Sequence, residues 1–210
     1  MRKKEKINPE IYDKEYYSSS NYANYFERAD RYKKTANELV DLLGKLNLVD
    51  TDSKILDFGC AVGFLGRALM ELGLKDVSGF EVSSWAAGEA RNHGLRVYED
   101  IGELDNMVPK VMFVLDVFEH MTPEQIHQAI NLIKPQLMVV RIPCALVENG
   151  DFHLEISRQD PTHINCLTKE QWISCFRNQG YNTFISLNLY TIYDSPGVMC
   201  GLLLKNKDAR

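Results

Sequence analysis

From residue 54 onward, the sequence alternates between short apolar runs rich in β-branched residues and longer stretches with helical periodicity. This alternation predicts an α/β fold, a parallel sheet with helices on both faces, because parallel strands need crossover connections. The expected strands cover residues 54–58, 77–81, 95–98, 111–116, 137–142, 183–190 and 198–204. Helical patterns cover residues 25–46, 63–72, 84–93, 122–133 and 167–179.

Ligands of doubly wound sheets bind beyond the carboxyl ends of the strands, so the residues that follow each expected strand are the candidates for chemistry. The first strand contains Asp57 and leads into a turn with Gly59, Ala61 and Gly63. This turn lacks the G-x-G-x-x-G spacing of dinucleotide-binding proteins and the Gly-Lys-Ser/Thr of a P-loop. The spacing therefore argues against a nicotinamide-dependent dehydrogenase, and on this segment alone a plain glycine turn remains the alternative.

Acidic residues follow three more of the expected strands. Glu81 ends the second strand, where nucleotide-binding folds of this kind place an acid on the ribose hydroxyls. Asp100 follows the third strand and suits an exocyclic purine amine, although a solvated loop is the alternative. Asp116, Glu119 and His120 follow the fourth strand, and buried strands rarely end in three ionisable groups without a reason.

Together these motifs resemble those of the class I S-adenosylmethionine-dependent methyltransferases, over roughly residues 12–205. The resemblance implies a doubly wound, Rossmann-like, seven-stranded sheet that is mostly parallel, with the last strand inserted antiparallel. It implies S-adenosyl-L-methionine as cofactor, contacted by Asp57, Gly59, Ala61 and Gly63 (methionine portion), Glu81 (ribose), Val82, Asp100 and Ile101 (adenine), Asp116 (pocket floor) and Tyr16. The usual pattern has glycine at the position of Ala61, where one methyl group fits if the turn keeps φ below zero.

Two outer segments resemble a narrower branch, the methyltransferases associated with sugar and polysaccharide metabolism. These segments are residues 12–17, which are rich in tyrosine, and residues 160–165. The resemblance implies that residues 1–24 cap the pocket of a methyltransferase domain spanning residues 25–210. It also implies O-methylation of a small-molecule, sugar or glycan hydroxyl. The alternative is a catalytically degenerate methyltransferase-fold binding module, for which Ala61 is the support.

The candidate catalytic residues are His163, His120 and Glu119. His163 lies in the long segment between the fifth strand and the last helix, which should overhang the transferred methyl group. Histidine suits the removal of a hydroxyl proton because its ordinary pKa lies near neutrality. We expect no metal site, since the group His153, Glu155, Asp160 and His163 lacks the tight paired spacing of typical ligands.

Charge and composition narrow the partners. The 24 basic and 29 acidic side chains give a formal net charge of −5, which makes nucleic acid an unlikely partner and favours a small-molecule acceptor. No apolar run reaches the roughly 18 residues of a membrane span. The five cysteines form no C-x-x-C pair, which is typical of reduced thiols in a cytoplasmic protein. The sequence leaves the oligomeric state open.

Overall fold

The sheet of the protein has seven strands in the order β3-β2-β1-β4-β5-β7-β6 in a computed structural model, which describes residues 8–18 and 25–205. All neighbouring pairs are parallel except those of β7, which runs antiparallel to both β5 and β6. This topology confirms the expected fold class. The strands are β1 Lys54–Phe58, β2 Asp76–Phe80, β3 Arg96–Tyr98, β4 Val111–Leu115, β5 Leu137–Pro143, β6 Thr183–Ser186 and β7 Val198–Leu204.

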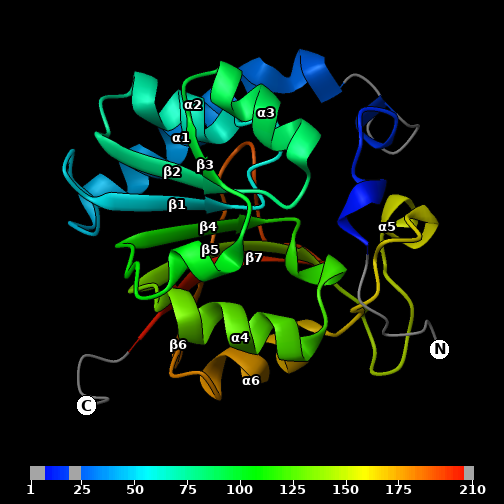
Figure 1. Cartoon of the computed structure of the whole chain (residues 1–210). Helices are drawn as coiled ribbons and strands as arrows, with labels where there is room; N and C mark the ends of the chain where they lie inside the picture. Colours follow the sequence, from blue (N-terminus) through cyan, green and yellow to red (C-terminus); the bar gives the residue numbers. More distant parts are fainter. Residues whose placement is uncertain (1–7, 19–24, 206–210) are drawn as a thin grey trace.

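Helices cover both faces of this sheet (Figure 1). The helices on one face are α1 Ala29–Lys45, α2 Phe64–Glu71 and α3 Ser84–Asn92; those on the other are α4 Pro123–Ile133 and α6 Lys169–Arg177. Each layer encloses its own apolar core, because the central strands present buried side chains alternately to the two faces. Thr122 and Thr168 form capping boxes at the starts of α4 and α6, as their sequence patterns predict.

The structure differs from the sequence expectations in three places. The predicted first helix begins as a 3-10 turn, Tyr25–Arg28, ahead of α1. Strand β6 ends at Ser186 because the next residues turn back on themselves, with a bridge between Asn188 and Tyr193. The long segment between β5 and α6 contains a short helix, α5 Glu155–Gln159, which at five residues is too short to give a periodic signal.

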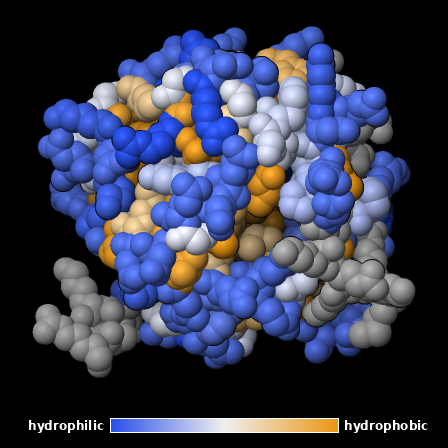
Figure 2. Space-filling view, viewed as in Figure 1, coloured by the Kyte–Doolittle hydropathy of each residue, from blue (hydrophilic) through white to orange (hydrophobic). Residues whose placement is uncertain are grey.

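A cavity lies at the carboxyl ends of β1, β2 and β4. In Figure 1, α5 and the described N-terminal residues both sit at this end of the sheet. The face of the molecule seen in Figure 2 is mostly hydrophilic, with apolar side chains visible in recesses between polar ones. Within the described residues, no helix has the length and apolar character needed to cross a bilayer.

Candidate active site

A cavity of about 430 Å³ opens beyond β1, β2 and β4, within the usual size range of small-ligand pockets. The described part of the N-terminal segment contributes Pro9, Tyr12, Tyr16 and Tyr17 to its wall. Most of the residues singled out in the sequence line this cavity: Tyr16, Asp57, Gly59, Ala61, Glu81, Val82, Asp116, Glu119, His120 and His163.

The turn after β1 brings the backbone close to the cavity through three left-handed residues at alternate positions. Gly59, Ala61 and Gly63 have φ values of 78°, 49° and 81°. The condition under which a methyl group at this position fits without strain, a φ below zero, is therefore not met. A left-handed conformation costs an L-residue roughly 1–2 kcal/mol. The N–H of Ala61 donates to Glu81 Oε2 at 2.9 Å, and this bond offsets part of that cost.

Glu81 fixes the turn to the end of β2. Its carboxylate accepts the N–H of Ala61 and, at 2.8 Å, the N–H of Ser83. Burial raises the pKa of Glu81, and these backbone hydrogen bonds oppose part of the shift. A carboxylate has about four acceptor sites, so the backbone N–H groups of Ala61, Val82 and Ser83 still leave capacity for a ligand hydroxyl. The sequence did not reveal that Glu81 would bind the backbone of this turn.

Asp57 places a second buried carboxyl group beside the turn. It accepts a hydrogen bond from the N–H of Gly66 in the first turn of α2, whose N-cap residue, Gly63, has no side chain to do so. Burial, with a smaller contribution from the charge of Glu81, raises the pKa of Asp57 to about 7. Two buried carboxyl groups at one end of the cavity favour a ligand with positive charge there.

Three of the expected cofactor residues do not line the cavity. A side chain at Gly63 would meet Ala90 Cβ at 2.8 Å, so this glycine permits close packing against α3. The exposed Asp100 uses its carboxylate to cap a 3-10 turn, accepting the N–H of Gly102 at 2.8 Å. Ile101 packs against the core on the α4 and α6 side of the sheet. Adenine contacts from Asp100 and Ile101 therefore stay predictions.

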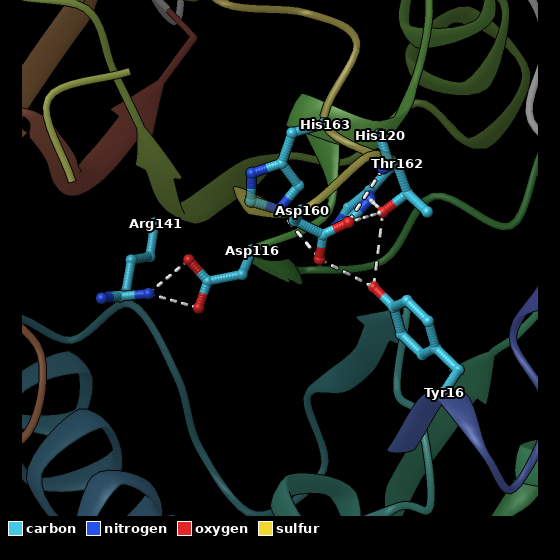
Figure 3. Close-up of polar contacts among 7 residues, drawn as sticks. All are labelled: Tyr16, Asp116, His120, Arg141, Asp160, Thr162 and His163. Atoms are coloured by element: carbon cyan, nitrogen blue, oxygen red, sulfur yellow. Dashed lines mark hydrogen bonds and ion pairs between the residues drawn. The ribbon is translucent and has the colours of Figure 1, made fainter. Parts of the chain in front are cut away.

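The opposite wall begins at the end of β4. Asp116 adopts a left-handed conformation, with φ of 58°, and its carboxylate forms an ion pair with Arg141 of β5 (Figure 3). The nearby negative charge of Asp116 raises the pKa of Arg141 further above its usual value. Sequence reasoning missed Arg141. The signal was available, since it is the single charged residue in the apolar run 137–142.

A chain of hydrogen bonds orients His120 (Figure 3). Thr162 Oγ1 lies 2.5 Å from Asp160 Oδ1 and 2.8 Å from His120 Nδ1, and the Tyr16 hydroxyl donates to Asp160 Oδ2 at 3.2 Å. Burial alone would raise the pKa of Asp160, but the hydrogen bonds from Thr162 lower it, so the carboxyl is ionised. An ionised carboxylate only accepts, so Thr162 donates to Asp160 and accepts from His120 Nδ1–H. This leaves the lone pair of His120 on Nε2.

His163 and Glu119 complete this wall. The rings of His120 and His163 meet edge to face, with centroids 4.6 Å apart. The carbonyl oxygen of Glu119 accepts the N–H groups of Ile164 and Asn165 at 2.9 and 3.0 Å, which holds the His163 loop in place. Burial strongly raises the pKa of the Glu119 carboxyl. Burial and the neighbouring His163 lower the pKa of His120.

The arrangement of strands and cavity is that of the class I methyltransferase fold. Neither a protein-family model nor a curated protein sequence matches the chain. Solved structures do match the chain. Magnesium protoporphyrin IX methyltransferase from Synechocystis, solved with bound S-adenosylmethionine, has a TM-score of 0.61 and 14% identity, with 95% of this chain and 98% of that chain covered.

Two further structures with this fold come from other organisms. A methyltransferase from Archaeoglobus fulgidus, described as dependent on S-adenosylmethionine, has a TM-score of 0.59 and 13% identity, covering 86% of this chain and 99% of its own. A possible histamine N-methyltransferase from Thermotoga maritima has a TM-score of 0.58 and 15% identity, with 87% of this chain and 95% of that chain covered. At these identities the likeness establishes the fold, and the function depends on the site itself.

Proposed function

We propose that this chain is an S-adenosylmethionine-dependent methyltransferase that methylates a hydroxyl group of a small molecule, sugar or glycan. The observation that carries the proposal is one cavity with two chemically different ends. Asp57, Glu81 and the left-handed turn lie where β1 and β2 end, whereas Glu119, His120 and His163 lie after β4 and in the segment between β5 and α6. In this proposal the first group forms the cofactor end of the cavity and the second group forms the acceptor end. The similar structures, one of them solved with this cofactor, support the same interpretation.

The first end fits the cofactor in charge and in shape. The ammonium and sulfonium groups of S-adenosylmethionine are cationic, which suits the buried carboxyl groups of Asp57 and Glu81. A side chain at Gly59 would collide with Val117 at 2.5 Å, so only glycine leaves this part of the wall as it is. In this proposal Tyr16 and the other described residues of the N-terminal segment, 8–18, close over the bound cofactor, and the remainder of the expected cap lies outside the described residues.

The second end fits an acceptor hydroxyl. The cofactor supplies a methyl group on a sulfonium, which is a good leaving group, so the protein must mainly align the acceptor and exclude water. As the new bond to the acceptor oxygen forms and the bond to sulfur breaks, the hydroxyl proton must leave. His163 takes this proton or orients the hydroxyl, with His120 and Glu119 beside it.

Replacing Glu81 tests the cofactor site. We expect Glu81→Ala to weaken S-adenosylmethionine binding by about 1.5–3 kcal/mol, tenfold or more in Kd, because a charge-assisted ribose contact and the anchor of the turn are both lost. Calorimetric titration of the folded variant measures the change. Glu99→Ala is the matched control, since Glu99 interacts with Ser84 and Arg91 outside the cavity and should leave the affinity unchanged.

A ribose-modified ligand separates the two roles of Glu81. If Glu81 holds the ribose hydroxyls, the 2′,3′-dideoxy form of S-adenosylhomocysteine should lose much less affinity than S-adenosylhomocysteine on Glu81→Ala. Equal losses for both ligands would show that Glu81 acts only through the turn. Unchanged affinity of Glu81→Ala for S-adenosylmethionine would place the cofactor elsewhere. A binding module without catalysis would bind the cofactor but give no methylated product with any acceptor of a hydroxyl panel.

A further inference from the structure

We propose that Glu119, His120 and His163 form a binding site for one divalent transition-metal ion at the acceptor end of the cavity. One ligand atom from each residue can be chosen so that all three lie within 4.8 Å of one another. The inference rests on the proposed function and specifies how that site binds the acceptor. It goes beyond the sequence analysis, which expected no metal and considered a different group of side chains.

The chemistry of the three side chains suits such an ion. Two imidazoles and one carboxylate are a common ligand set for divalent first-row metals, with the remaining coordination positions open to water or substrate. Ligand atoms about 2.1 Å from one ion lie roughly 3–4 Å from each other. In the structure the three chosen atoms lie within 4.8 Å of one another, so side-chain rotations would have to bring them closer around a bound ion.

The buried carboxylate of Glu119 is a second, independent observation that points to a cation. Glu119 is 0% exposed, and neither of its carboxylate oxygens has a hydrogen-bond partner among the residues that the structure describes. Leaving a buried acceptor unsatisfied costs about 1–3 kcal/mol, and more for a charged group. A metal ion bound by Glu119 would satisfy these lone pairs.

The surroundings of His120 are those of a metal ligand. Metal-binding histidines usually donate their second ring N–H to an oxygen that fixes the tautomer. Here His120 Nδ1–H donates to Thr162, which is held by Asp160, so Nε2 carries the lone pair (Figure 3). The negative charge of Asp160 acts on the same cluster and further favours a cation, whereas the charge of Asp116 is compensated by Arg141.

All three side chains line the cavity, so the open positions of the ion would face an acceptor. An acceptor hydroxyl bound there would ionise more easily, because a divalent cation lowers the pKa of a bound oxygen. The methyl group would then pass from sulfur to this oxygen, and the hydroxyl proton would go to water. With the ion bound, His163 serves as a ligand, and the metal takes over the activation of the hydroxyl.

Metal titration of the apoprotein tests this inference. We expect one Zn²⁺ per chain by calorimetry, and Co²⁺ should give visible absorption bands typical of nitrogen and oxygen ligands. Glu119→Gln, which keeps the size of the side chain, should weaken Zn²⁺ binding at least tenfold and change the Co²⁺ spectrum. His127→Gln is the matched control, because His127 lies on the exposed face of α4 beside Asn131 and should have no effect.

The outcomes separate this inference from the proposed function. Absence of Zn²⁺ binding to wild type, or equal binding to wild type and folded Glu119→Gln, overturns the metal site. If folded Glu119→Gln cannot be obtained, His120→Asn replaces it, with the same loss expected. S-adenosylmethionine is titrated separately in the presence of a chelator. Binding of the cofactor under those conditions leaves the proposed function standing even when the metal site fails.

Discussion

Gly59→Val should abolish detectable binding of S-adenosylmethionine. Gly59 has φ of 78°, which β-branched residues rarely adopt, and its Cβ would lie 2.5 Å from Val117 Cγ2. Because Val117 itself lines the cavity, the new side chain must either displace it inward or shift the turn. Either movement takes space from the methionine portion of the cofactor. Calorimetric titration at a temperature where the variant is folded measures the loss.

A second glycine provides the control for backbone strain. Gly73 also has a positive φ, 92°, but a side chain there would meet no atom within 4 Å, and this residue lies away from the cavity. Gly73→Val should therefore lower the unfolding temperature while leaving cofactor binding intact. If folded Gly59→Val binds as tightly as wild type, the turn does not hold the cofactor.

His163→Ala should lower kcat by about 10²–10⁴-fold, with cofactor affinity nearly unchanged. The side chain lines the cavity in edge-to-face contact with His120, at the end proposed to bind the acceptor. Steady-state kinetics on an acceptor found by screening, together with a cofactor titration, measure both quantities. Removal of a proton acceptor or a metal ligand reduces kcat, whereas loss of a positioning contact mainly raises KM for the acceptor.

His153→Ala is the matched control, since His153 lies in the same segment between β5 and α6 but does not line the cavity. Its kcat and KM should match those of wild type. Wild-type kcat and KM in His163→Ala would instead leave His120 or Glu119 as the residue that acts on the acceptor.

The fold could be predicted from the sequence because its signals are local. The buried runs of β4 and β5, the capping residues Thr122 and Thr168 and the glycine-rich turn each determine a short stretch of chain. Together they indicate a parallel α/β sheet with right-handed connections. The antiparallel insertion of β7 was implied only by the resemblance to methyltransferases. The helix α5 was not predicted because its five residues are too few to show a period in hydrophobicity.

The candidate site was only partly predictable, because its contacts join residues far apart in the chain. The positions of Glu81 and Asp116 at strand ends are visible in the sequence, but their partners are not. Glu81 holds the backbone of Ala61, and Asp116 at the end of β4 pairs with Arg141 in the neighbouring strand β5. The backbone N–H groups of Ile164 and Asn165 donate to the carbonyl of Glu119, which brings the two histidines together. The spacing of residues in the sequence gives no sign of these bonds.

Titration of S-adenosylmethionine into the wild-type protein tests the central claim most directly, because that claim is that the cavity beyond β1, β2 and β4 binds this cofactor. Calorimetry should show one molecule bound per chain, competition by S-adenosylhomocysteine and no heat with NAD. Absence of binding to the folded protein would contradict the account.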